Sequence, residues 1–434
     1  MKNKLQSKNT DVVIVGAGPA GCAASMHLSK LGVDHMLLEK ECFPRDKICG
    51  DALSGKVVDF FRKTNTTWLN EIDHRSAQFL PSNGVIFGAP NKQVLKVPFS
   101  TNSNQNKQAP GFISRRIDFD TFLASKVKNR LMENTEVLSA KRQNDIWEIQ
   151  TNQRVIKSKI IISAAGAQSN WARKTHNFKI EKDHFCAGLR AYYNGVSGLD
   201  PQGFIELHFV KDILPGYFWI FPMAEGYANI GLGMLSSQIS KDKINLKQKL
   251  QEVLALPQFK ERFKSANLEG EILGWGLPLG SKKRPLSDDG ILLTGDAASL
   301  IDPFTGEGIG NALNSGKLAA ECAHLAIQSK NFAQSFLKQH YDQLVYQKLW
   351  SELRLSRIMQ KLVRFPWLFN LVVNKANKNT TLRHTITCMF EDVDLRAKLK
   401  SPKFACNESP TFSKYHKCYK LAKRHVLPGN CLPI

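Results

Sequence analysis

The amino-acid sequence predicts an α/β fold that combines a parallel sheet with an inserted antiparallel β-sheet and a C-terminal helical region. The first observation is a short apolar run over residues 11–15, followed by a glycine-rich turn and a helix rich in small residues. The second is a series of short alternating strands between residues 186 and 234. The third is a run of helical patterns from residue 331 to 399.

The glycine-rich turn after the first strand has the spacing of a dinucleotide-binding fingerprint. In such a turn Gly16 permits the tight bend, Gly18 lets the backbone approach a pyrophosphate, and Gly21 allows close helix–strand packing. A second strand over residues 35–38 ends at Glu39, whose carboxylate would accept the ribose hydroxyls. The alternative is a turn without a ligand, but the order of strand, glycines, helix, strand and acid favours a cofactor. The predicted turn consists of Gly16, Ala17, Gly18, Pro19, Ala20 and Gly21.

A second candidate element lies far along the chain, where the apolar run 291–293 precedes Gly295 and Asp296. The carboxylate can accept hydrogen bonds from hydroxyl groups, and the helix N-terminus that follows can face an anion. A cofactor held by Glu39 at its adenosine end and by Asp296 at its ribityl end must be long and carry a polyol. These requirements indicate FAD. The glycine-rich turn before the helix adds Gly306, Gly308 and Ile309 to the predicted site.

The loop over residues 43–54 follows the second strand and carries groups suited to the same cofactor. Arg45 and Lys47 would supply positive charge to a phosphate. Cys49 next to Gly50 would place a thiol beside a ring. A free cysteine is more often a small buried hydrophobic residue, so the sequence leaves both roles open for Cys49.

A predicted helix opens around residues 113–120 and runs to about Met132. Arg116 in its first turn has two alternative roles. It either reaches the pyrophosphate or forms an ion pair with Asp120 at the helix start. Further along, Tyr217, Trp219 and Phe221 alternate and therefore project from one face of a predicted strand. Three aromatic rings could wall an apolar cavity over the flavin, although core packing is the commoner reason for this spacing.

The chain has 434 residues and a formal net charge of +22, which favours anionic partners. No helix-turn-helix, zinc-finger or RNP pattern accompanies the charge, so we do not expect nucleic acid as a partner. An anionic membrane surface is a candidate partner, and a generically basic soluble protein is the alternative. The predicted helix 362–373 has aromatic and apolar residues flanked by cations, which suits either an interfacial helix or a core helix with snorkelling cations.

The nine cysteines occur singly, without a CxxC pair, and residues 1–10 lack the apolar core of a signal peptide. We therefore expect a cytoplasmic protein, with Cys22 and Cys42 serving as packing residues. Peripheral attachment to the inner face of the membrane is the alternative that stays open. The sequence contains no run of eighteen apolar residues, so we predict no transmembrane helix. The cysteines and histidines after residue 402 are too irregular for a metal site, and we expect no bound metal.

The predicted organisation is discontinuous. Residues 1–65, 100–178 and 280–330 form the cofactor-binding domain, and residues 66–99 and 179–279 form the substrate domain with the antiparallel sheet. Residues 331–402 form the C-terminal helices, and residues 403–434 form a disordered basic tail.

The chain resembles the geranylgeranyl reductase family, within the group of flavoproteins that share the p-hydroxybenzoate hydroxylase fold. The resemblance runs from about residue 11 to 402. It rests on the glycine turn with Glu39, on the stretch 43–50, on the YxWxFP arrangement over 217–222, and on the Gly295–Ile309 element. It implies a Rossmann-like FAD-binding domain of the glutathione-reductase type. The implied cofactor-binding set is Gly16, Ala17, Gly18, Pro19, Ala20, Gly21, Glu39, Lys40, Arg45, Cys49, Gly50, Arg116, Val137, Gly295, Asp296, Gly306, Gly308 and Ile309.

The resemblance also implies that reduced FAD passes a hydride from N5 to a carbon–carbon double bond of an isoprenoid lipid or quinone. Cys49, Tyr217 and Trp219 are the implied catalytic residues, with Cys49, Tyr217 or water as the proton source. Tyr217, Trp219 and Phe221 would line the path of the isoprenoid chain. The implied electron donor is NADPH. Because Ala165-Gly166 stands where relatives usually have Asp-Gly, a ferredoxin-like acidic electron-transfer protein is the other candidate.

Two other functions remain open at this point. The first is an FAD-dependent monooxygenase that hydroxylates or epoxidises an aromatic or polyketide-like substrate. The second is a flavin-carrying surface protein without enzymatic activity. A complete flavin cradle beside an aromatic strand favours the reductase over both.

Overall fold

The computed structural model describes residues 8–99, 109–167 and 180–379, and all of them fall within one compact unit. The predicted tail 403–434 and the last part of the predicted helical region, 380–402, lie outside the described residues.

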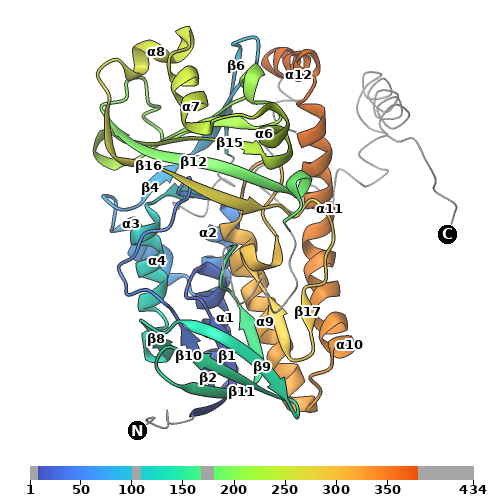
Figure 1. Ribbon diagram of the computed structural model, residues 1–434. Coiled ribbons are helices and arrows are strands. Elements are labelled where there is room, and N and C mark those ends of the chain that lie inside the picture. The colour runs from blue at the N-terminus through green and yellow to red at the C-terminus, as the bar shows by residue number, and fades with distance from the viewer. Residues whose placement is uncertain (1–7, 100–108, 168–179, 380–434) are drawn as a thin grey trace, which may run out of the picture. The chain divides into compact units, whose positions relative to one another are not determined.

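A parallel sheet organises the half of the molecule that begins with the glycine-rich turn (Figure 1). Strand β1 lies in its centre and pairs in parallel with β2 on one side and β11 on the other. Buried apolar residues such as Val13 and Ile14 of β1 face both layers, as expected for a parallel strand covered on both sides. The strands of this sheet are β17 Ser287–Asp288, β18 Ile291–Leu293, β11 Val155–Ser163, β1 Lys8–Val15, β2 His35–Leu38 and β8 Leu131–Met132. Strand β10 Ile146–Thr151 pairs with β11, and β9 Val137–Gln143 pairs with β10.

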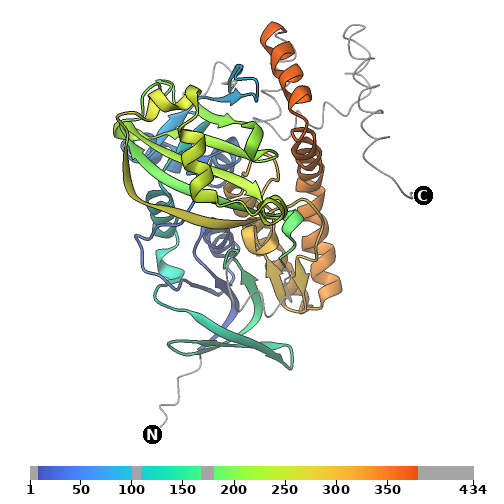
Figure 2. The same ribbon diagram turned by 45° about the horizontal axis from the view of Figure 1, so that its top comes forward.

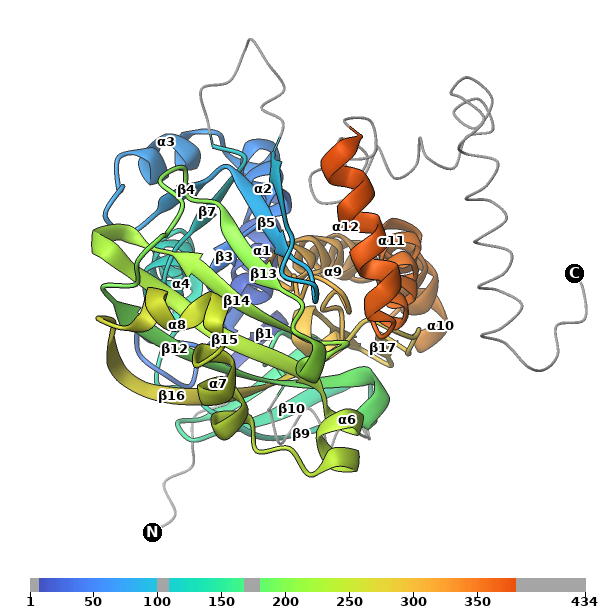
Figure 3. The ribbon, with the colours of Figure 1, turned by 90° about the horizontal axis from the view of Figure 1, so that it is seen from above.

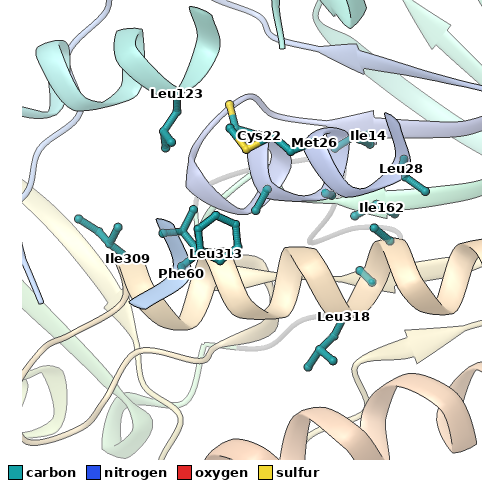
Figure 4. Close-up of a cluster of buried hydrophobic side chains, with 14 of the residues drawn as sticks. Ile14, Cys22, Met26, Leu28, Phe60, Leu123, Ile162, Ile309, Leu313 and Leu318 are labelled. Atoms are coloured by element: carbon teal, nitrogen blue, oxygen red, sulfur yellow. The ribbon is translucent and has the colours of Figure 1, made fainter. Parts of the chain in front are cut away.

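Helices α1 (Pro19–Lys30) and α9 (Ile309–Ser329) pack closely against each other beside this sheet. Figure 4 shows Cys22 and Met26 of α1 in the same cluster of buried side chains as Leu313 and Leu318 of α9. A Cβ added at Gly316 would lie 2.1 Å from the backbone oxygen of Ala20, so only glycine allows this approach. The contact joins residues nearly 300 positions apart and brings the two predicted cofactor-binding segments together.

A second, largely antiparallel sheet organises the other half of the molecule (Figure 3). Phe218 and Ile220 of its central strand β14 face a core shared with Leu250 and Phe259 of the covering helices α7 and α8. The alternate residues of β14 therefore face the other way. The strand order is β16 Asn267–Pro278, β12 Phe185–Asn194, β15 Tyr227–Leu235, β14 Tyr217–Pro222, β13 Ile205–His208, β5 Gly84–Gly88 and β6 Val94–Pro98. The helices and turns that follow β15 are α6 Ser236–Asp242, α7 Leu246–Leu254 and α8 Pro257–Phe263.

A small three-stranded sheet and three helices connect the two larger sheets. The sheet has the order β3 (Ala52–Leu53), β7 (Gly111–Ile113) and β4 (Leu80–Ser82). The helices are α2 Gly55–Thr64, α3 Thr67–Asp73 and α4 Arg116–Ser125.

The described C-terminal part is helical, and α11 and α12 follow one another along one side of the molecule (Figure 2). Among the described residues, no helix combines the length and apolar character needed to cross a lipid bilayer. The bounds are α10 Gln334–Leu337, a π-helical segment Lys338–Asp342, α11 Gln343–Leu362 and α12 Pro366–Lys378.

Three local predictions are wrong. The helix that opens near residue 113 ends at Ser125 rather than Met132, because residues 131–132 form β8 and pair with β2. Residues 67–73, within the region predicted as strands only, form helix α3. Cys42 is exposed rather than packed, whereas Cys22 is buried as expected.

Candidate functional site

The glycine-rich turn between β1 and α1 is held by close backbone contacts. Gly16 has a φ of 98°, and a Cβ there would lie 2.5 Å from the backbone oxygen of Ala164. A Cβ at Gly21 would lie 1.8 Å from the oxygen of Gly16. At Gly18, by contrast, a Cβ would meet no atom within 4 Å, so the backbone faces open space. This combination fits a pyrophosphate that approaches the backbone at Gly18.

Glu39 lies beside this turn at the end of β2 and is 5% exposed. Its Oε2 accepts a hydrogen bond of 2.9 Å from the backbone N–H of Ala17. The carboxylate is therefore fixed next to the turn, as the fingerprint predicts. Binding to a ribose remains a prediction.

A buried chain of alternating charges continues from Glu39. Arg45 contacts Glu39 at 3.3 Å and Asp120 at 2.8 Å. Arg116 binds the two oxygens of Asp120 at 2.7 and 2.8 Å. Although burial alone would raise the pKa of Asp120, the charges and hydrogen bonds of Arg116 and Arg45 lower it. The ion pair is thus the alternative that the structure realises for Arg116, and a phosphate contact stays a prediction.

Two other predicted cofactor ligands lie at the edge of this region. The Lys40 ammonium is exposed to solvent and lies 3.4 Å from the carboxylate of Glu41. Val137 at the start of β9 is buried in the core beneath the parallel sheet. Neither side chain joins the charge chain around Glu39 in the contacts described here, so their contact with a cofactor remains a prediction.

The second candidate element, which contains Gly295 and Asp296, begins at the short 3₁₀ helix η5, Gly295–Ala298, which one residue separates from β18. A Cβ at Gly295 would lie 3.4 Å from the Cβ of Ala20, which brings this element against the glycine-rich turn. A Cβ at Gly308, the residue before α9, would lie 3.6 Å from Oδ1 of Asp296. Asp296 and the start of α9, including Ile309, are therefore neighbours, as predicted. The Lys47 ammonium lies 3.2 Å from Oδ2 of Asp296.

The turn before α9 is tied to the aromatic strand of the antiparallel sheet. Tyr217 donates a hydrogen bond of 2.7 Å to the backbone oxygen of Thr305. A Cβ at Gly306 would lie 2.6 Å from the Tyr217 hydroxyl, so this position requires glycine. Burial, followed by the charges of neighbouring groups such as Asp302, raises the pKa of Tyr217 above its usual range. The Tyr217 proton is thus committed to a carbonyl acceptor.

The three predicted aromatic residues form one row on β14. The ring centroids of Tyr217 and Trp219 are 6.2 Å apart, and those of Trp219 and Phe221 are also 6.2 Å apart. A Cβ at Gly50 would lie 3.1 Å from the Phe221 ring and 3.8 Å from Nε1 of Trp219. The row therefore faces the Cys49-Gly50 turn rather than the core behind the sheet.

Cys49 is half-buried, with a free thiol. Although burial alone would lower the pKa of Arg116, Asp120 and Cys49 raise it, because both interact with the guanidinium. The Cys49 side chain therefore lies beside the buried charge chain, at the junction between the two predicted halves of the site. Among residues 8–99, 109–167 and 180–379, no cluster of three potential metal ligands occurs.

A polar network beneath the Cys49 turn was not predicted from the sequence. The Asn229 amide donates to the backbone oxygen of Cys49 at 2.9 Å and to Oδ2 of Asp51 at 2.8 Å. Its own oxygen accepts the Trp219 indole N–H at 2.8 Å. Tyr192 donates to Oδ2 of Asp51 at 2.6 Å. Asn229 could have been noticed as a polar residue inside the apolar strand 227–235, but its partners could not.

The comparisons with known proteins agree with this geometry. An FAD binding domain matches residues 9–64, and a geranylgeranyl reductase catalytic domain matches residues 188–269. The chain is 30% identical to digeranylgeranylglycerophospholipid reductase of Methanocaldococcus jannaschii, over 81% of this chain and 87% of that protein. The chain belongs to the geranylgeranyl reductase family.

A second member of the geranylgeranyl reductase family, from Methanosarcina acetivorans, is 29% identical over 79% of this chain and 80% of that protein. The solved structure of a geranylgeranyl bacteriochlorophyll reductase-like protein from Thermoplasma acidophilum superposes with a TM-score of 0.75. It has 21% identity and covers 95% of this chain and 99% of that chain. The fold is thus the predicted one, and the protein is an FAD-dependent oxidoreductase.

Proposed function

We propose that this protein saturates carbon–carbon double bonds in the isoprenoid chains of lipids or quinones. The observation that carries the proposal is the contact between the Cys49-Gly50 turn and the aromatic row of β14, next to both halves of the cofactor cradle. The relatives' names support a lipid with geranylgeranyl chains as the substrate class. When bound, reduced FAD supplies a hydride to the double bond.

The residues of the chain have separate roles in this proposal. Glu39 binds the ribose, and the positive charge of Arg45 and Arg116 faces the pyrophosphate. Asp296 and the start of α9 hold the ribityl chain and the pyrimidine edge. The rings of β14 position the isoprenoid chain and exclude water, which contributes to the rate because a fixed geometry removes part of the entropic barrier.

The decisive experiment uses the purified, FAD-loaded protein after anaerobic reduction. Mixing with a digeranylgeranylglycerophospholipid should oxidise the flavin and add two hydrogens per turnover, detected by mass spectrometry. A W219A variant should react at least tenfold more slowly, whereas L138A, an exposed leucine on β9, serves as the matched control. Product formation that requires dioxygen would favour the monooxygenase instead.

For the electron donor we propose NADPH or an acidic ferredoxin-like protein. The net charge of +22 supports the second, because a basic surface attracts an acidic partner. Ala165 and Gly166 come shortly after β11, and a Cβ at Gly16 of the glycine-rich turn would lie 3.1 Å from the Cα of Ala165. Anaerobic flavin reduction by each donor in separate reactions distinguishes them.

We further propose that helix α12 docks the protein on an anionic membrane surface. Phe365, Trp367, Leu371 and Val372 are all exposed, with Trp367 66% exposed. The opposite face packs on the protein, because Asn370 contacts Asn91 and the Phe369 ring lies 4.6 Å from Phe209.

Cations flank the exposed apolar residues of α12, which complements anionic lipid. Arg364 lies just before the helix, and Lys375 and Lys378 lie in its last turns. Each lysine or arginine near such a surface contributes about 1 kcal/mol. Because the substrate is proposed to be a lipid, docking here would bring the protein to its source.

Sedimentation with phosphatidylglycerol vesicles tests the docking surface. A W367S/L371S variant should bind at least tenfold more weakly than the wild type, whereas L138S should bind normally. Equal binding of all three would contradict the proposal. Loss only on removal of residues 380–434 would instead assign the binding to that segment.

A further inference from the structure

Asp51 is a buried carboxyl that the proposed reaction has not yet used. It follows the Cys49-Gly50 turn and its side chain is fully buried. Its backbone has a φ of 67°, so the turn holds it in the left-handed region that aspartate tolerates better than most residues. No lysine, arginine or histidine of the described residues lies within ion-pair distance of its oxygens.

The two oxygens of Asp51 have different environments. Oδ2 accepts the Tyr192 hydroxyl at 2.6 Å and the Asn229 amide at 2.8 Å, which occupies both of its lone pairs. Oδ1 is buried and has no hydrogen-bond partner among the residues that the structure describes. When Asp51 is neutral, its proton must therefore sit on Oδ1 and point to an acceptor that the described residues do not provide.

The neighbours of Asp51 are those of the proposed reaction. A Cβ added at Gly50 would lie 3.1 Å from the Phe221 ring and 3.8 Å from Nε1 of Trp219, and Asn229 joins Asp51 to the Trp219 indole. Tyr217, the other hydroxyl of this row, already donates to Thr305. Among the described residues around this turn, Asp51 is thus a carboxyl that is held in a fixed position with one oxygen unpartnered.

We propose that Asp51 is the acid that completes saturation of the double bond. This proposal rests on the proposed function, in which the bound reduced FAD supplies the hydride. The hydride and its electron pair form a C–H bond at one carbon as the π bond breaks. The Oδ1 proton forms the C–H bond at the other carbon, and the resulting carboxylate is stabilised by Tyr192 and Asn229. Water then returns the proton to Asp51.

The surroundings of Asp51 place its pKa in the slightly acidic range, so the carboxyl is mostly protonated below about pH 6 and mostly ionised at pH 7. Burial raises its pKa to about 6, against the hydrogen bonds of Tyr192 and Asn229. Arg190 of β12 lowers this pKa and Asp46 of the loop before Cys49 raises it, and these two groups form an ion pair of 2.6 Å. Arg115 stacks on the far side of Tyr192. An acid with a pKa close to the working pH is well suited to general-acid catalysis.

The test compares the wild type with D51N, which keeps an oxygen to accept from Tyr192 and Asn229. In anaerobic single turnovers with a digeranylgeranylglycerophospholipid at pH 6, D51N should react about 100-fold more slowly or worse. Its FAD dissociation constant should stay within threefold of the wild type. D59N is the matched control because Asp59 on α2 is partly exposed and pairs with Lys63 at 2.7 Å, away from Asp51 and Arg190. It should retain the rate within threefold.

A second readout does not depend on activity. Infrared difference spectra of the FAD-loaded protein between pH 5 and pH 8 should show a protonated carboxyl band that is absent in D51N. A missing band, or a D51N rate within threefold of the wild type, overturns the role of Asp51 as the acid. If the wild type itself fails to react with the lipid, the proposed function is wrong. The infrared band depends only on the protonation of Asp51, so the two failures can be told apart.

Discussion

At the scale of single residues, Asp51 makes the stability of the protein depend on pH. Burial raises its pKa from the usual 3.8 to about 6, despite the hydrogen bonds from Tyr192 and Asn229. Because the folded state binds this proton more tightly than the unfolded state, the contribution is favourable at low pH. It is lost as the pH rises from about 4 to about 6, and the ionised form costs about 3 kcal/mol.

A D51N variant removes this pH dependence. Its free energy of unfolding relative to the wild type should increase by roughly 2 kcal/mol between pH 4.5 and pH 7.5. Urea unfolding at both pH values measures the difference. A constant difference between the two proteins would show that Asp51 does not titrate in this range.

Glu39 and Asp296 are the residues on which the cofactor prediction depends. If Glu39 and Asp296 bind the hydroxyls of FAD as proposed, Glu39→Gln and Asp296→Asn should each cost about 1.5–3 kcal/mol and lower affinity roughly 10- to 100-fold. Fluorescence titration of the apoprotein with FAD measures this. Glu41→Gln, two positions from Glu39 and exposed, is the control and should bind FAD normally.

Glu39 and Asp296, the acids at the two ends of the cradle, could be predicted because each comes shortly after a recognisable strand in the sequence. The sequence left Arg116 open between a phosphate and Asp120, and the structure shows the ion pair. Asp51 and Asn229 could not be paired from the sequence, since their contact joins positions 178 residues apart.

At the scale of elements, the packing of α1 on α9 decides whether the two halves of the cradle meet. Gly316→Ala would place a Cβ 2.1 Å from the Ala20 oxygen, so the helices must separate. We expect a loss of about 1–3 kcal/mol in stability and a weaker affinity for FAD. Thermal unfolding and FAD titration measure these, and Glu321→Ala on the same helix is the control. If stability falls while the affinity for FAD is unchanged, the contact between α1 and α9 contributes to packing but not to cofactor binding.

Elements with a clear apolar pattern were predicted well, including the short strands β2 and β18, whereas the short elements β8 and α3 were not. β1, α1, β14 and α9 were all recognisable from apolar periodicity or alternation. The two-residue strand β8 exists only because β2 offers it a partner, so its own residues carry no signal. The helix predicted over 362–373 overlaps α12, which begins at Pro366 and ends at Lys378, and only the structure shows that Trp367 and Leu371 face outward.

At the scale of the whole molecule, the net charge of +22 governs encounters with anionic partners. If an acidic ferredoxin-like protein is the donor, the second-order rate constant of flavin reduction should fall at least tenfold between about 50 and about 500 mM salt. The reason is that salt over this range screens the attraction between the basic surface and the acidic donor. Reduction by NADPH should change much less. Stopped-flow absorbance of the flavin distinguishes the two, and equal salt dependence would argue against electrostatic steering of a protein donor.

The sequence by itself determined the cofactor class and the family. Glycine spacing, an acid at a strand end and alternating aromatics are local patterns with direct physical causes. Tertiary structure alone decided which of these groups meet. It brought Gly295 against Ala20, turned the aromatic row of β14 toward the Cys49 turn, and paired Asp51 with Tyr192 and Asn229. Such contacts depend on how two sheets and their helices pack, and packing is a property of the whole chain rather than of any single segment.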